Sequence, residues 1–303
     1  MATFRVKDFD RGSFPQIYRS ADDASLSGQR WYIAWVTINL SLLFLGAVAG
    51  SITFSNLHHR QTVQIVAAIV FFVALGTTIL LAVRRWERIW YSGRAVAESA
   101  KSLTWKFVCG ADPFPLELDS NEAVARFTDA LQELLKENKH LASVLSSRDD
   151  GGEQITGFMT GIRGSATGVR RDVYLSQRVN EQREWYANES RKNHSRRKIW
   201  LTILVLFQAT AGAAAIILAI FPLFPWRGAA VFGTLASATV AWGQMKRYQE
   251  LAQAYGLAAQ ELSLNAARGA YVATDEDLAR FVNDAETAIS REHSMWVARR
   301  ETK

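Results

Sequence analysis

The chain has 303 residues, 49% of them hydrophobic, and its 35 Lys and Arg residues outnumber its 29 Asp and Glu residues, for a net charge of +6. The hydrophobic residues gather in four uncharged runs, a distribution that excludes an ordinary soluble protein. The single cysteine, Cys109, excludes both an intrachain disulfide and a cysteine-based zinc site.

The apolar runs predict membrane-spanning helices. Residues 31–54, 62–83 and 199–221 contain no charged residue, and each has about the 20 residues that a bilayer-crossing helix needs. Residues 228–245 are also uncharged but rich in Ala, Gly, Ser and Thr, so they form either a marginal fourth span or a buried soluble helix. A span is favoured because only a short turn separates this run from the third. We therefore expect an all-α integral membrane protein with two hairpins and long cytoplasmic helical extensions.

The basic residues near the spans predict their orientation. The two short hairpin loops hold only Arg60 and Arg227, whereas the opposite ends are flanked by clusters that include Arg84, Arg85 and Lys198. Basic residues mark the cytoplasmic side. Both termini and residues 84–198 are thus expected in the cytoplasm, with the chain in the inner (cytoplasmic) membrane of the cell. The net positive charge then favours anionic lipid headgroups over nucleic acid as a partner.

Two similar units are detectable along the chain. Tyr18 aligns with Tyr186, and farther along Arg84 aligns with Arg247 and Glu98 with Glu261. Each unit reads as a polar helix, a membrane hairpin and a cytoplasmic helix that continues from the membrane without a break. The predicted division is a first unit at 1–111, a helical connector with a Gly-rich, flexible linker at 112–168, and a second unit at 169–303.

Regular spacing of apolar residues predicts helical packing faces in the cytoplasmic segments. Alternating steps of four and three place these side chains on one face of a helix, as in a coiled-coil seam. The first helix carries Trp86, Trp90, Gly93, Ala97 and Ala100; the second carries Leu251, Tyr255, Ala258 and Leu262. Within 112–141 the inward face of an amphipathic helix is expected to comprise Val124, Phe127, Leu131, Leu134 and Leu135.

Two amides lie near the middle of predicted spans. Asn39 in the first span and Gln208 in the third are at matched depth, where a lone amide is costly and should face protein or water. Each residue is a candidate for lining a pore, and the alternative for each is a hydrogen bond between helices.

The fourth run carries two overlapping patterns. Small residues at every fourth position, including Gly233 and Ala241, permit close approach of another helix. A polar line of Thr234, Ser237 and Gln244 would suit an aqueous path in an oligomer. The sequence alone leaves both interpretations open.

The C-terminal helix places a carboxylate on an apolar face. Leu278, Val282, Ala285 and Ile289 continue to Glu292 and Trp296 with the same alternating spacing. A buried Glu292 would need a cationic partner such as His293, whereas a frayed terminal helix would leave it hydrated. We expect packing that controls opening at Glu98, Glu261, Glu292, His293 and Trp296.

Signatures of catalysis and cofactor binding are not recognisable in the sequence. Gly168 is followed by Val-Arg-Arg rather than the Lys-Ser/Thr of a phosphate-binding loop, and no HExxH or GxSxG pattern occurs. Charged coupling residues, which are common in transporters, are missing from the spans. We expect neither an enzyme, nor a metal or cofactor site, nor a solute transporter.

Several segments together resemble a known family. "QREWYANESRKNHSRRKIW", "QMKRYQELAQAYGLAAQEL" and "FVNDAETAISREHSMWVARR" in the second half are similar to the SLATT family of two-span effectors. "SADDASLSGQRWYIAW" and "WYSGRAVAESAKSLTWKFVCGADPF" resemble another subtype of the same family. Members are found beside SMODS nucleotide second-messenger synthetases and SLOG sensors.

The resemblance implies a role in bacterial conflict or antiviral defence. The expected function is a homo-oligomeric, pore- or channel-forming effector that a nucleotide second messenger or a sensor protein opens to depolarise the membrane. The alternative is a non-conducting membrane anchor or scaffold for a cytoplasmic signalling partner.

Overall fold

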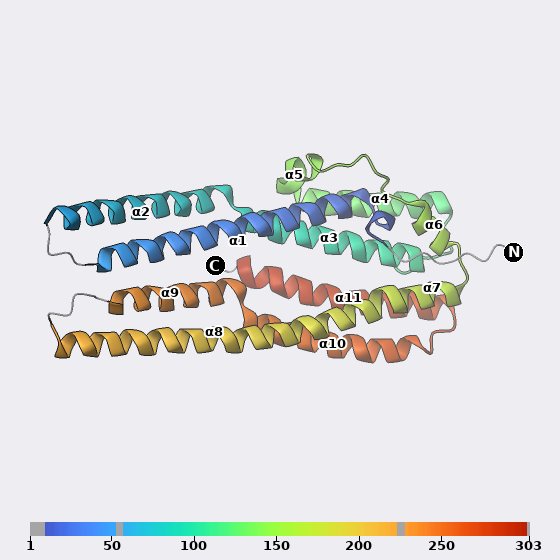
Figure 1. The fold of residues 1–303 in the computed structure, drawn as a ribbon. Coiled ribbons are helices and arrows are strands. Elements are labelled where there is room, and N and C mark those ends of the chain that lie inside the picture. The colour runs from blue at the N-terminus through green and yellow to red at the C-terminus, as the bar shows by residue number, and fades with distance from the viewer. Residues whose placement is uncertain (1–9, 53–56, 223–227, 302–303) are drawn as a thin grey trace. The chain divides into compact units, whose positions relative to one another are not determined.

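The computed structural model describes residues 10–52, 57–222 and 228–301, with side chains described up to residue 290. Most of the described chain is helical, and it contains no β-strand (Figure 1). Its longer α-helices are α1 (Gln16–Ser51), α2 (Leu57–Arg84), α3 (Trp86–Cys109), α4 (Ser120–Glu137), α8 (Glu181–Ile220), α9 (Gly228–Lys246), α10 (Tyr248–Gly269) and α11 (Asp275–Glu301). Shorter helices are α5 (Ala142–Ser146), α6 (Gly157–Arg163) and α7 (Thr167–Tyr174), and the π-helical turn η3 (Leu175–Asn180) joins α7 to α8.

The chain forms two compact units. The polar unit comprises residues 1–29, 87–190 and 253–303, and the hairpin unit comprises residues 30–86 and 191–252. Each unit therefore draws on both halves of the sequence. The long helices α1 and α8 begin in the polar unit and end in the hairpin unit.

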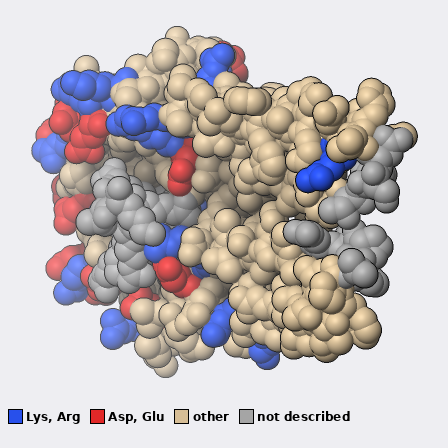
Figure 2. All heavy atoms as spheres, turned by 90° about the vertical axis from the view of Figure 1, so that its left-hand side faces the viewer, with Lys and Arg blue, Asp and Glu red and all other residues tan. Residues whose placement is uncertain are grey.

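The hairpin unit pairs α1 with α2 and α8 with α9 (Figure 1). In the most apolar windows of the three helical stretches Gln16–Ser51, Leu57–Cys109 and Thr167–Ile220, only 6%, 17% and 0% of the residues are buried. Figure 2 shows a broad area that is almost free of coloured, charged side chains. Apolar helices with so little burial are those expected of a protein whose solvent is lipid. α9 is helical as expected but is not among the three stretches long and apolar enough to cross a membrane.

We expect the helices that follow each hairpin to continue without a break, but each is interrupted at one residue. Arg85, between α2 and α3, has φ of 48°, and Arg247, between α9 and α10, has φ of 51°. Each residue still donates its N–H one turn back, to Leu81 and Gly243 respectively. These are left-handed helix ends of the kind that glycine usually supplies. Arg85, rather than Arg84, is thus the structural equivalent of Arg247.

Aromatic side chains fill the core of the polar unit. Phe127 of α4 packs on Phe107 at 4.9 Å and on Phe114 at 5.6 Å between ring centroids. Trp105 meets the Tyr174 ring edge-on at 5.6 Å. The amphipathic pattern of α4 is confirmed for Phe127 and Leu131, which are buried, whereas Leu135 is 37% exposed.

The two predicted packing faces are used within one chain. Gly93, Ala97 and Ala100 of α3 are buried, as are Ala258 and Leu262 of α10. Tyr255 packs on Trp185 and Tyr186 of α8, with centroids 5.2 and 5.5 Å away. The seam on α10 therefore forms an intramolecular contact, with Leu251 half-buried at its start.

The Gly-rich segment, for which we expect a flexible linker, packs against the start of α1 through residues 150–154. Gln154 donates to the Gln16 side chain at 2.9 Å, and Gln16 donates its backbone N–H to the Glu153 carbonyl at 3.0 Å. Arg19 forms a two-point ion pair with Asp150. Glycine is required at position 151, where φ is +70°, because the turn adopts the left-handed conformation there.

Candidate functional site

A buried ion pair lies at the centre of the polar unit. Arg178 donates from Nε and Nη2 to the two carboxylate oxygens of Glu286, at 2.9 and 2.8 Å. The Arg178 side chain is 1% exposed and the Glu286 side chain 0% exposed. Two parallel charge-assisted bonds of this kind fix the orientation of both side chains.

Neighbouring hydroxyl groups complete the shell around Glu286. Tyr174 donates its hydroxyl to Oε1 at 2.9 Å, and Ser102 of α3 donates to Oε2 at 2.7 Å. The carboxylate therefore accepts four hydrogen bonds from three different segments, which compensates for its removal from water. Tyr174 and Arg178 are one turn apart, at the end of α7 and in the π-helical turn.

The electrostatics of this cluster follow from burial and from the pair itself. Burial acts to lower the pKa of Arg178, but the charge of Glu286 and its hydrogen bonds outweigh it, so the pKa is raised overall. Burial, reinforced by the charge of Glu286, raises the pKa of Tyr174 well above its ordinary value. Both side chains therefore keep their protons throughout the physiological range.

Two further charged side chains border the pair on α3. Glu98 lies with Oε2 at 3.9 Å from Nη1 of Arg178 and is 26% exposed. Lys101 lies 5.6 Å from the centroid of the Phe14 ring, and its pKa is lowered by burial and by the charge of Arg178. Glu98, one of the expected packing residues, is thus located beside the buried cation.

The arrangement is suited to mechanical coupling. It ties α11 and α3 to a helix that continues through the π-helical turn into α8, as far as Ile220. π-helical turns inside α-helices recur at functional sites. Glu286 is therefore bonded to the turn that leads directly into the helix with the third apolar stretch.

In the hairpin unit, Asn39 bonds to the neighbouring helix. Its Nδ2 lies 2.9 Å from the Ala74 carbonyl, 2.6 Å from Oγ1 of Thr77 and 2.9 Å from Oγ1 of Thr78. This is the interhelical hydrogen bond that the sequence allowed as an alternative to pore lining. Gln208 on α8, at matched depth, is instead exposed.

The polar line on α9 faces largely outward in the single chain. Ser237 and Gln244 are exposed, while Thr234 is half-buried and donates to the Ala230 carbonyl at 2.9 Å. Among the described residues, Gly233 and Ala241 of the small-residue stripe make no close helix contact, because a Cβ on Gly233 would meet no atom within 4 Å and Ala241 is exposed. The face that packs inward carries Val231, Ala236 and Thr239 instead.

The predicted seam on α11 holds, but a different carboxylate lies buried beside it. Leu278, Val282, Ala285 and Ile289 are all buried. The alternating spacing does not predict that Glu286, adjacent to Ala285, is buried, because it lies outside the seam. The buried face of α11 is wider than the seam and includes Glu286. The side chains of Glu292, His293 and Trp296 lie outside the described residues. Glu261 is half-buried on α10.

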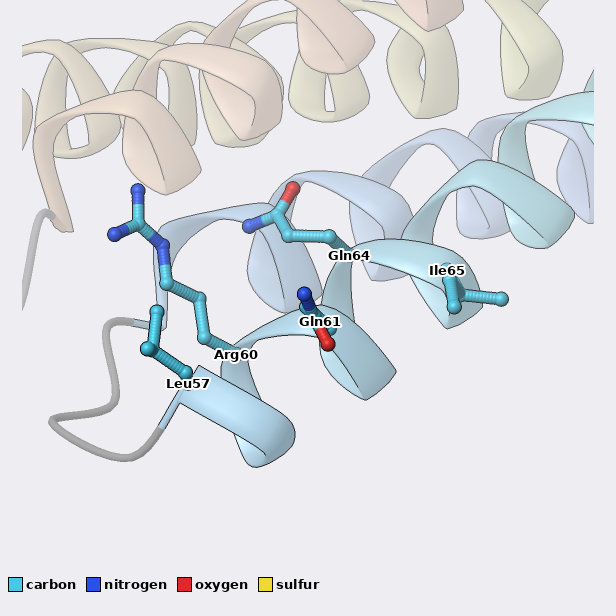
Figure 3. Close-up of a pocket in the computed structure, with 5 residues that line it drawn as sticks. All are labelled: Leu57, Arg60, Gln61, Gln64 and Ile65. Atoms are coloured by element: carbon cyan, nitrogen blue, oxygen red, sulfur yellow. The ribbon is translucent and has the colours of Figure 1, made fainter.

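A shallow pocket of about 470 Å³ lies at the start of α2. Its described lining consists of Leu57, Arg60, Gln61, Gln64 and Ile65. Figure 3 shows Arg60 and Gln64 extending to the same side of the helix. One cation, two amides and two apolar side chains are typical of the border between a span and water.

Fold and site together define an all-helical membrane protein that contains two similar apolar hairpins and a polar unit built around a buried ion pair. Residues 15–171 match the model of SMODS and SLOG-associating 2TM effector domain 3, and residues 174–296 match that of domain 1. The chain belongs to this SLATT family and carries two subtypes in tandem, as predicted. SLATT domains are effectors associated with conflict and defence systems. In the same comparisons, no curated protein and no solved structure matched.

Proposed function

We propose that this protein is a homo-oligomeric membrane effector whose four hairpin helices, α9 included, line a water-filled path that opens on a cytoplasmic signal. Flow of ions along this path would depolarise the membrane. The protein would act without catalysis and without a cofactor. The description of each matched domain as a two-span effector supports both the membrane location and the effector role.

The observation that carries this proposal is the exposure of polar side chains on apolar helices. Gln208 on α8, and Ser237 and Gln244 on α9, are exposed in the single chain. An amide without a hydrogen-bonding partner in hydrocarbon costs several kcal/mol, roughly 4–8 on the strictest scale. These side chains therefore need either water or another copy of the chain, and a polar-lined assembly supplies both.

The distribution of basic residues supports the proposed orientation. With 84–198 and both termini on the cytoplasmic side of the inner membrane, the polar unit would face the cytoplasm, and Arg60, in the first turn of α2, would lie on the opposite side. The signal would then reach the polar unit, where the Arg178–Glu286 pair ties α11 to the helix that leads into α8. The association with SMODS and SLOG proteins in the family description supports a nucleotide second messenger or a sensor protein as that signal.

The proposal is tested by membrane potential and dye leakage in cells that express the wild type, Gln208→Leu or Ser237→Ala/Gln244→Leu. Replacing polar lining with apolar side chains should reduce ion flow about tenfold or more while the protein still reaches the membrane. The matched control is Ile216→Leu, an exposed position on the same helix (62%) that keeps its apolar character.

Two outcomes would decide against conduction. If the wild type leaves the potential unchanged with its signalling partner present, the chain conducts nothing. If the wild type still recruits that partner to the membrane under these conditions, the non-conducting scaffold is the correct description.

A further inference from the structure

The internal repeat extends to the helices that follow each hairpin. α4 contains Ala125-Arg126-Phe127, and α11 contains Ala279-Arg280-Phe281. In both helices the arginine pairs with the glutamate one turn earlier, Arg126 with Glu122 at 2.6 Å and Arg280 with Glu276 at 3.9 Å. The two helices are therefore equivalent, and Gln132 of α4 occupies the place of Glu286 in α11.

The same equivalence holds for the helices that leave the hairpins. Arg85 and Arg247 mark the same left-handed break, immediately before α3 and α10. Counting from these arginines, Glu98, Ser102 and Trp105 of α3 correspond to Gln260, Leu264 and Ala267 of α10, so Glu98 aligns with Gln260 rather than with Glu261.

Inside one chain, this face of α3 is covered by the second half. Ser102 donates to Glu286, Glu98 lies near Arg178, and Trp105 packs on Tyr174. The corresponding face of α11 is buried as well, with Val282 at 0%, Glu286 at 1% and Ile289 at 5% exposure.

The faces of α10 and α4 that correspond to these faces of α3 and α11 are both exposed. The α10 stripe consists of exposed, uncharged side chains at alternating steps of four and three: Gln253, Leu257, Gln260, Leu264 and Ala267. The α4 stripe has the same spacing and also consists of exposed, uncharged side chains: Asn121, Ala125, Thr128, Gln132 and Leu135. Leu257 and Leu264 are 58% and 69% exposed. The helices lie at opposite edges of the polar unit in Figure 1.

We infer that the α10 stripe of one copy packs against the α4 stripe of the next copy, repeating between chains the contact that α3 makes with α11 within a chain. Such a head-to-tail contact uses two different surfaces, so it generates a closed ring or an open row rather than a two-fold dimer. A second copy of this chain is the partner because the α10 stripe corresponds to the α3 face, and the α4 stripe to the α11 face, that contact each other within one chain.

The chemistry of the stripes suits an interface that forms between separate chains. Two amides, Gln260 and Gln132, stand where the intrachain contact has Glu98 and Glu286. Burying them leaves no unpaired charge, which would cost several kcal/mol per ion. Leu264 and Leu135 would supply apolar burial, and Gln260 and Gln132 would supply hydrogen bonds.

This inference takes oligomeric assembly from the proposed function, and its test measures association rather than conduction. Membranes that contain Leu264→Cys/Gln132→Cys are treated with a short thiol-specific bifunctional crosslinker, and the products are separated by denaturing electrophoresis. The native Cys109 is 1% exposed, and burial raises its pKa, so it should stay unmodified. A Cys109→Ala background run in parallel verifies this.

The expected result is a ladder of dimers, trimers and larger products, because each copy offers one cysteine to each neighbour. Each single-cysteine variant should remain monomeric. The control pair Leu264→Cys/Glu133→Cys moves the second cysteine about 100° around α4, to a side chain that is 63% exposed. It should give at least about fivefold less product, because the side chain points away from the proposed contact.

Dimers from Leu264→Cys alone would show symmetric α10 pairing and overturn the inference, as would a complete lack of product from the double variant. Light scattering in detergent provides a second measurement. Leu257→Lys/Leu264→Lys should reduce the mass to that of one chain, whereas Leu26→Lys, at another exposed leucine (46%), should not. A ladder without depolarisation would contradict only the proposed pore, and depolarisation without the ladder only this contact.

Discussion

Glu286 and Arg178 face each other through two hydrogen bonds of 2.8–2.9 Å in the core of the polar unit, with neither side chain accessible to solvent. The pair joins the terminal helix to the π-helical turn before α8. A buried pair has a high cost when one partner is lost, because the remaining charge has no water to solvate it.

Removing one charge of this pair should therefore destabilise the protein strongly. Glu286→Gln is expected to lower the free energy of unfolding by about 3–5 kcal/mol, measured by urea unfolding in detergent. The control Glu276→Gln, on the same helix and 83% exposed, should change it by less than about 0.5 kcal/mol. Arg178→Met/Glu286→Leu should recover most of the loss. Equal effects of both glutamate substitutions would contradict the role of the pair.

Substitutions of the two amides in the hairpin unit, Asn39 and Gln208, should differ in their effect on stability. Asn39→Leu removes hydrogen bonds to three acceptors on α2, so thermal unfolding in detergent should show a loss of about 0.6–1.7 kcal/mol. Gln208→Leu, at an exposed position, should leave unfolding of the detergent-solubilised single chain nearly unchanged. The interpretation fails if Gln208→Leu is the more destabilising of the two.

Two glycines with different surroundings provide a matched test of helix packing. A Cβ on Gly93 would lie 3.0 Å from the Ser25 backbone nitrogen and 3.1 Å from the Ala21 carbonyl oxygen, so α1 and α3 would have to separate. Gly93→Ala should cost about 1–3 kcal/mol of stability. Gly233→Ala meets open space and should gain up to about 1 kcal/mol through helix propensity. Thermal melting of both variants checks this prediction. A lower melting temperature for Gly233→Ala than for Gly93→Ala would contradict it.

Acid should weaken the contact between the Gly-rich segment and α1. The hydrogen bond from Arg19, together with the Gly152 backbone N–H, lowers the pKa of Asp150 from 3.8 to about 2. Because the folded-state pKa lies below the unfolded value, the stabilisation is complete above pH 3.8 and disappears as the pH falls through about 2. The stability difference between wild type and Asp150→Asn, measured by thermal melting across pH 2–7, should shrink accordingly. Arg19→Gln should reduce this pH dependence, because only the backbone hydrogen bonds then lower the pKa of Asp150, and a difference that does not shrink toward pH 2 would contradict the assignment.

Much of the architecture was predictable from local patterns. Uncharged apolar runs identified the apolar helices, and alternating spacing identified buried residues such as Ala258, Leu262, Leu278 and Val282. These predictions succeed because helix geometry places regularly spaced side chains on one face, whatever that face contacts. The tandem arrangement was recognisable for the same reason, since both units have the same order of polar and apolar segments.

Other features depended on which helices meet. Nothing in the spacing of α11 distinguishes Glu286 from an exposed glutamate, and only its contacts with Arg178 and Ser102 show that it is buried. The left-handed breaks at Arg85 and Arg247 carry no glycine that would have revealed them. The sequence alone determined the helices, their apolar faces and the membrane class, because these depend on neighbours along the chain. Tertiary structure alone decided the burial of charge, the bonding of Asn39 and the open stripes on α4 and α10, because partners from distant segments define each of them.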